Sequence, residues 1–177
     1  GGGRGGVAGG GDGEGESGAA LPSPDVMSVF KALAEAKAGA VTAWLESSLL
    51  DGAEPAAAGK TLIFAHHHAM HDAIAAFLGK ALSQQEWIQI TGKTPRSERT
   101  GLLDHFQTHP ACRFALLALT ACGVGLNLSC ADTAVFSELC WNPATLEQAE
   151  ARIHRMGQLA SHVHVYYLLG GEGDGSL

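Results

Sequence analysis

The apolar residues of this chain gather in short runs that are separated by stretches with helical spacing. Runs of strand length occur at residues 61–65, 87–90, 114–119, 133–136 and 163–168. The first of them, Thr61-Leu62-Ile63-Phe64-Ala65, shows no polar alternation, which is typical of a strand covered on both faces. The pattern therefore predicts buried strands.

Helices are predicted between these strands. Apolar residues recur at helical spacing over residues 70–82, 97–107 and 146–155. Residues 23–50 are rich in Ala, Leu, Lys and Glu, start at Ser23-Pro24-Asp25 and have a weak point at Gly39, so one or two helices fit there. Alternating strands and helices predict an α/β fold with a mostly parallel sheet and helices on both faces. Ligands of such sheets bind at the loops after the carboxyl ends of the strands.

Composition divides the chain into four parts. The first eighteen residues hold eleven glycines and almost no large apolar side chain, so we expect residues 1–22 to be a disordered linker. A helical lead-in (23–55), a folded lobe (56–169) and a Gly-rich tail (170–177) follow. A chain of 177 residues with 46% apolar content can bury one ordinary core. Because the sequence lacks a first Met and ends in a glycine-rich stretch, we expect a fragment of a longer polypeptide.

The charge balance limits the possible partners. The formal net charge is −7, and from Ala56 onward eight Lys/Arg stand against ten Asp/Glu. Nucleic acid normally requires a basic face, so any DNA contact has to be local. The sequence has no run of eighteen apolar residues and no signal-peptide design, so neither membrane insertion nor secretion is indicated. The four cysteines form no C-x-x-C pair, which favours buried thiols over a zinc ribbon or disulfides.

The segment 119–128 is the first candidate for chemistry. Gly123 and Gly125 would let backbone amides come close to a phosphate or a nucleic-acid backbone, and Thr120 adds a hydroxyl. Taken alone, two glycines after a strand are weak evidence for function and are better explained by a tight turn.

The segment 148–158 is the second candidate. Arg152 and Arg155 stand three residues apart on one helical face, near a helix end that is followed by Gly157. Two guanidinium groups on one face suit a multiply charged phosphate, whereas the plainer alternative is a solvated basic face.

Together these segments resemble the Swi/Snf family of superfamily-two helicases. Residues 148–158, Q-A-x-x-R-x-H-R-x-G-Q, resemble motif VI, and residues 120–128 with Trp141-Asn142-Pro143 resemble motif V and the W-N-P signature. Residues 61–65 match motif IV. Residues 91–94 and the later Arg99 match the segment usually written D-G-S-T, although Thr91 replaces the usual Asp and Lys93 the usual Ser. The likeness covers about residues 60–168 in the correct order.

Within this family, residues 64–67 and 136–143 most resemble the HepA-related annealing-helicase branch. Glu138 stands where most remodellers have Asp.

The resemblance implies the second RecA-like lobe of a DNA-dependent ATPase that acts in the nucleus. ATP and Mg²⁺ would be held mainly by a first lobe of the same polypeptide, and arginines inserted from this lobe would stabilise the transferred phosphoryl group. The family places arginine fingers at Arg155 and Arg152, nucleotide coupling at Gln148 and Gly125, and DNA contacts at Gly92, Lys93, Thr94, Thr120 and Gly123.

Other interpretations stay open. The sequence contains no G-x-x-x-x-G-K-[ST] and no D-E-x-H-type motif, so we expect no ATPase activity from this chain alone, and a stand-alone nucleotide-binding protein is disfavoured. The lobe could instead serve only as an interaction module. His67 and His71 are one helical turn apart and could share a zinc ion, but the sequence places no third ligand, so we predict no metal site.

Overall fold

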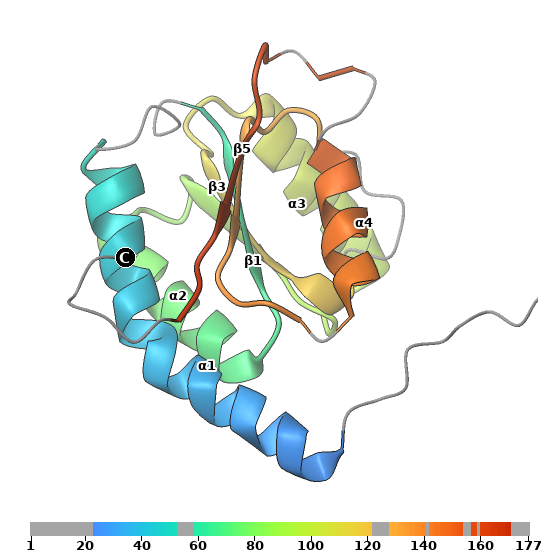
Figure 1. The fold of residues 1–177 in the computed structure, drawn as a ribbon. Coiled ribbons are helices and arrows are strands. Elements are labelled where there is room, and N and C mark those ends of the chain that lie inside the picture. The colour runs from blue at the N-terminus through green and yellow to red at the C-terminus, as the bar shows by residue number, and fades with distance from the viewer. Residues whose placement is uncertain are drawn as a thin grey trace, which may run out of the picture.

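The computed structural model describes residues 23–52, 59–121, 128–140, 142–153, 157–158 and 160–170. The predicted linker (1–22) and the tail after Gly170 lie outside them, so the four-part division of the chain stays a prediction. In the part that the structure describes, five parallel strands form one sheet with the order β2-β3-β1-β4-β5 (Figure 1). The strands are β1 (Thr61–Ala65), β2 (Trp87–Ile90), β3 (Phe114–Ala118), β4 (Thr133–Phe136) and β5 (His164–Tyr167). The predicted α/β architecture is confirmed.

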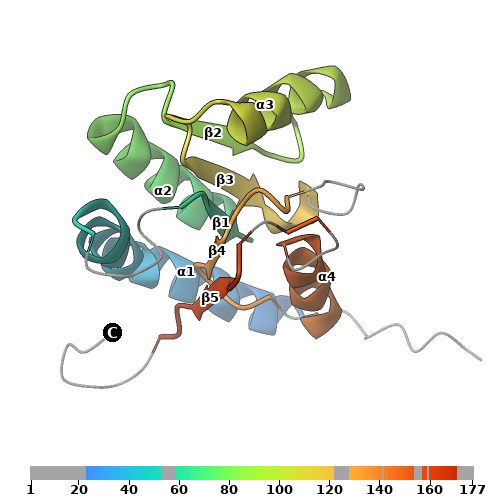
Figure 2. The same ribbon diagram turned by 90° about the horizontal axis from the view of Figure 1, so that it is seen from above.

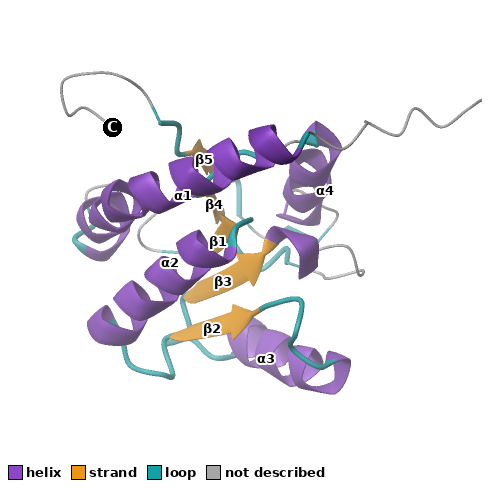
Figure 3. Cartoon of the chain, turned by 90° about the horizontal axis from the view of Figure 1, so that it is seen from below, coloured by secondary structure: helices purple, strands orange, loops and turns teal. Residues whose placement is uncertain are grey.

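Helices cover both faces of this sheet. Helices α1 (Pro24–Leu45) and α2 (His68–Ala81) pack on one face, and α3 (Arg96–Thr108) and α4 (Pro143–Ile153) pack on the other (Figures 2 and 3). A π-helical turn, η1 (Glu46–Leu50), extends α1, and a 3-10 turn, η3 (Leu119–Ala121), follows β3. No helix in the described residues is long and apolar enough to cross a membrane.

The position of strand β1 in the sheet explains why polar and apolar residues do not alternate in its sequence. Leu62 and Phe64 pack into the core under α3 and α4, whereas Ile63 and Ala65 pack into the core under α1 and α2. Because β1 lies in the middle of the sheet and pairs with both β3 and β4, both of its faces are buried, and four of its five residues are apolar.

Helix α1 is one helix rather than two. Ser23 caps it by accepting a hydrogen bond from the N–H of Val26, and Pro24 occupies the first turn, as the sequence predicts. The helix continues through Gly39, which is exposed with no atom near the place of a side chain. On its inner side Val41 and Leu45 are fully buried in the sheet-facing core. That packing outweighs the low helix propensity of a single glycine.

Two predicted strands are slightly shorter in the structure. The run 114–119 ends as strand at Ala118, because the chain turns into η3 at the sheet edge, and the run 163–168 is strand only over His164–Tyr167. The carboxyl ends of all five strands lie at one edge of the sheet, in the lower part of Figure 1, next to the first turn of α2 and the middle of α1. This edge is where the predicted ligand-binding loops gather.

Candidate functional site

The loop after β2 is a tight turn held by its own threonines. Thr94 Oγ1 accepts a hydrogen bond from the backbone N–H of Thr91 at 3.0 Å, and Thr91 Oγ1 accepts one from the N–H of Lys93 at 3.2 Å. The N–H of Thr94 in turn donates to the carbonyl of Thr91 at 3.2 Å. These contacts fix the backbone, and the side chain of Lys93 remains exposed at the tip.

Arg99, in the first turn of α3, holds the same loop from behind. Its Nε donates to the carbonyl of Thr94 at 2.8 Å, and its Nη2 donates to the carbonyls of Thr91 and Gly92, both at 3.1 Å. A planar guanidinium with donors in a fixed fork can bond several carbonyls at once. The sequence resemblance marks Arg99, but only the structure shows that its side chain points into the loop.

The loop after β3 lies beside the loop after β2, because these two strands are neighbours in the sheet. A Cβ added to Gly92 would lie 3.9 Å from Thr120 Oγ1. Gly92, Lys93 and Thr120 are all exposed. The structure therefore brings together the predicted DNA-contact residues that it describes, on one side of the carboxyl edge.

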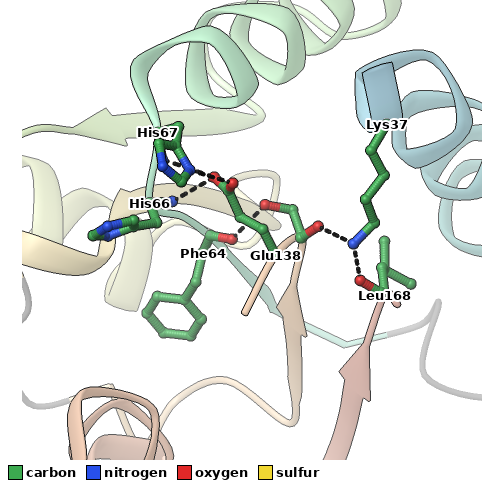
Figure 4. A network of polar contacts seen from close by, with 7 residues as sticks. Lys37, Phe64, His66, His67, Glu138 and Leu168 are labelled. Atoms are coloured by element: carbon green, nitrogen blue, oxygen red, sulfur yellow. Dashed lines mark hydrogen bonds and ion pairs between the residues drawn. The ribbon is translucent and has the colours of Figure 1, made fainter. Parts of the chain in front are cut away.

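Glu138, just after β4, connects this strand to the loop after β1. Its Oε1 accepts hydrogen bonds from the backbone N–H groups of His66 and His67 at 2.8 and 2.7 Å, and its Oε2 lies 2.7 Å from Nδ1 of His67 (Figure 4). The carboxylate is buried at the N-terminus of α2, where backbone N–H groups and the helix dipole favour a negative charge. Burial is the main cause that lowers the pKa of His66, with His67 adding to it and Glu138 opposing it.

Lys37, from α1, joins the same network from the other side. Its ammonium donates to the carbonyl of Ser137 at 2.9 Å and to the carbonyl of Leu168 at the end of β5 (Figure 4). Ser137 Oγ donates to the carbonyl of Phe64 at 2.7 Å. Burial lowers the pKa of Lys37, and the nearby charge of Glu138 opposes this shift. Contacts from Lys37 and Glu138 thus tie together the ends of β1, β4 and β5.

Helix α4, which was predicted to carry the arginines, runs back toward the opposite edge of the sheet (Figure 1). Gln148 is exposed midway along it, and Arg152 belongs to its last turn, although the structure does not describe the Arg152 side chain. Gln158 Nε2 donates to the carbonyls of Ala131, before β4, and Ile153, the last residue of α4, at 2.8 and 3.2 Å. The end of α4 is therefore fixed at the amino edge. Arg155, Gly123 and Gly125 lie outside the described residues.

The histidines after β1 do not form a three-ligand site. Across the described part of the chain, no three His, Cys, Asp or Glu side chains are placed so that they could hold a metal ion. His71 is buried and its Nδ1 lies 3.3 Å from Gln89 Nε2. Cys112 is buried and burial raises the pKa of its thiol, as it does for Cys130.

A family model, "Helicase conserved C-terminal domain", matches residues 42–157 of this chain. The match includes β1 to β4, the loops at their carboxyl ends, and α4. The chain belongs to this family.

Relatives of this helicase C-terminal domain come from the Swi/Snf group. The chain is 41% identical over 133 residues to the Drosophila melanogaster "SWI/SNF-related matrix-associated actin-dependent regulator of chromatin subfamily A-like protein 1", covering 75% of this chain and 17% of that protein. It is 39% identical over 144 residues to the "DNA annealing helicase and endonuclease ZRANB3" of Mus musculus, covering 81% of this chain and 13% of that protein. The chain thus spans less than a fifth of the length of these relatives.

A solved structure supports the same fold. The C-terminal part of the Fun30 ATPase domain matches with a TM-score of 0.63 at 26% identity, over 75% of this chain and 40% of that one. The parallel sheet with helices on both faces is therefore the RecA-like fold of a Swi/Snf helicase C-terminal domain, as the sequence motifs predict.

Sequence reasoning missed the charged network of this helicase domain. Glu138 entered only as a departure from the family's usual Asp, and Lys37 was part of the lead-in with no role. The sequence pairs His67 with His71 as a possible zinc site that lacks a third ligand, whereas in the structure His67 contacts the carboxylate of Glu138.

Proposed function

We propose that this domain works as the second lobe of a DNA-dependent ATPase. A first lobe holds ATP and Mg²⁺, this lobe inserts Arg155 and Arg152 toward the phosphates, and its carboxyl-edge loops contact the DNA backbone. Cycles of lobe closure then move the protein along duplex DNA or rewind separated strands in the nucleus. This agrees with the names of its relatives, which include an annealing helicase and a regulator of chromatin.

One observation supports the proposed DNA contact. Gly92, Lys93 and Thr120 lie together and exposed at the carboxyl ends of β2 and β3. Exposed Lys93 supplies a positive charge, Thr120 a hydroxyl, and the glycine leaves room for close approach of a phosphate. Thr94 supports the turn with its hydroxyl. Gly123 is assigned to the same contact by its place in the motif.

The arginine assignment rests on the motif and on the fixed course of α4. Asn142 Oδ1 caps the helix by accepting a hydrogen bond from the N–H of Ala144 at 3.0 Å, and Gln158 ties the end of the helix to Ala131, two residues before β4. A rigid helix suits groups that stabilise charge in the transition state, since they must be in place before the reaction. Gln148 on this helix, and Gly125 by its motif, would couple the nucleotide to DNA.

The test uses a chimera. The Drosophila relative receives this chain in place of its own matched segment, and DNA-stimulated ATP hydrolysis is compared with that of Arg155→Ala and Arg152→Ala. We expect kcat to fall about 10³-fold or more in Arg155→Ala while nucleotide binding survives. Lys80→Ala, which removes an exposed charge at the end of α2, is the matched control.

The alternative function is that of an interaction module, in which the domain binds a partner and takes no part in ATP hydrolysis. Unchanged hydrolysis in both arginine variants would favour it and would contradict the finger assignment. The 177-residue chain alone is expected to hydrolyse no ATP, since its sequence has no phosphate-binding loop.

A further inference from the structure

The contact between Glu138 and His67 joins two loops that belong to different parts of the sequence. The two side chains are 7% and 15% exposed, and Oε2 of Glu138 lies 2.7 Å from Nδ1 of His67. We propose that Glu138 and His67 are a positioning pair, which fixes the direction of the chain from β4 into α4 relative to the loop after β1. Its effect on catalysis rests on the function proposed above.

The geometry of Glu138 explains how it sets this direction. Both carboxylate oxygens are used, Oε1 by two backbone N–H groups and Oε2 by the His67 ring. On the strand side, Ser137 is fixed by its N–H and its hydroxyl, which both donate to the carbonyl of Phe64 at 3.0 and 2.7 Å. The chain therefore leaves β4 with neither Ser137 nor Glu138 free to turn.

Only a short connection separates Glu138 from α4. The helix begins at Pro143, and on the way Cys140 Sγ donates to the carbonyl of Asn142 at 3.0 Å while Asn142 caps the helix. The hydrogen bonds of Cys140 and Asn142 transmit the position of Glu138 to the first turn of α4. A rotation of α4 would move Arg152, which belongs to its last turn.

His67 contributes to this network through one ring nitrogen. Nδ1 contacts Glu138, whereas Nε2 is buried and has no hydrogen-bond partner among the described residues. Asparagine carries an amide close to where Nδ1 lies and has nothing in place of Nε2. His67→Asn should therefore keep the contact, and His67→Leu should remove it.

The first experiment uses the 177-residue chain and amide hydrogen exchange. In Glu138→Ala and His67→Leu we expect protection at residues 147–150 of α4 to fall at least tenfold, while α3, on the same face of the sheet, is unchanged. His67→Asn and His68→Ala should match the unmodified chain, since His68 is exposed and outside the network. Equal loss of protection in α3 and α4, or no loss in α4, would overturn the proposal.

The second experiment places the same variants in the Drosophila chimera. A positioning pair predicts that Glu138→Ala and His67→Leu lower kcat at least tenfold with little change in KM for ATP, because misplacement of reacting groups by about 1 Å is enough for large losses. The double variant should be no worse than the worse single variant, since both changes break one contact. Additive losses, or a change in KM alone, would contradict the pair. If the unmodified chimera shows no DNA-stimulated hydrolysis, the proposed function fails, and the exchange experiment still decides the positioning role.

Discussion

Gly92 and Thr120 lie face to face, with 3.9 Å between Thr120 Oγ1 and the place where a Gly92 side chain would begin. They are 28 positions apart in the sequence, and they meet because β2 and β3 are parallel neighbours whose carboxyl ends share one edge. The backbone of one loop and the hydroxyl of the other therefore present a single polar surface next to Lys93.

Gly92→Ala tests whether this surface needs an open backbone. A Cβ at 3.9 Å makes ordinary van der Waals contact, so the free energy of unfolding should change by no more than about 0.5 kcal/mol. Affinity for a short duplex should fall about tenfold, since the methyl group blocks a hydrogen bond to a charged phosphate. Fluorescence anisotropy measures the binding. Unchanged affinity would show that the phosphate does not approach at Gly92.

Lys93→Ala tests the charge on the same surface. If Lys93 contacts one phosphate, the slope of log K against log salt concentration should become smaller by about 1, in addition to weaker binding. Lys80→Ala, which removes an exposed lysine from the end of α2, should leave the slope unchanged. The measurement is a salt titration of duplex binding at four or more concentrations.

Arg99→Lys tests the support behind the loop. A single ammonium cannot reach the three carbonyls that the Arg99 guanidinium bonds. The free energy of unfolding of the variant should therefore fall by about 1–3 kcal/mol. Affinity for a DNA duplex should also fall, because Arg99 holds the loop in shape although its own side chain faces into the loop. Urea denaturation measures the stability. Arg96→Lys, in the same turn but exposed, is the control, and an equal loss there would refute a specific role for Arg99.

Most of the fold could be predicted because its strands are short apolar runs, and the central strands β1 and β4 are buried along their whole length. The apolar run of β1 has the same bounds as the strand, and the run of β3 goes one residue further, to the buried Leu119 of η3, so the pattern marks both strands to within a residue. The π-helical turn Glu46–Leu50 could not be predicted, since its residues read as ordinary helix formers and only the packing of Leu49 against the sheet shows the change. The π-helical turn therefore depends on tertiary packing rather than on local sequence preference.

The candidate site could be predicted only in part. The loop 91–94 and Thr120 come from local motifs, and the sheet order then brings them together. The Lys37 contacts join residues 100 and 131 positions apart and involve main-chain carbonyls, which every sequence offers. No spacing rule marks such a partner, so a lysine in the first helix could not be linked to the strand ends before the structure was known.

Gln158→Glu tests how the end of α4 is held. Gln158 Nε2 donates to two carbonyls and its Oε1 accepts from the N–H of Ala160 at 3.0 Å. A carboxylate would place negative charge against the carbonyls of Ala131 and Ile153, and should cost about 1–3 kcal/mol. Gln148→Glu, at an exposed position of α4, should change stability by no more than about 0.5 kcal/mol. Equal effects in the two variants would show that Gln158 does not anchor the helix.

Because His71 is buried, we expect the folded chain to lose stability in weak acid. Burial lowers its pKa below the ordinary value of 6.5, with Asp72 opposing this shift and His68 adding to it, and burial lowers the pKa of His66 as well. Between the folded and unfolded pKa values the unfolded chain binds more protons, so stability is complete above about pH 6.5 and falls as the pH drops toward the folded values. The pKa of Glu86 is lowered from 4.5 by hydrogen bonds from Ser83, so Glu86 changes the stability only at a more acid pH. Urea denaturation between pH 5 and 7.5 should show a smaller pH dependence in His71→Leu than in the unmodified chain. A flat profile in the unmodified chain would mean that the buried histidines become protonated without a cost to folding.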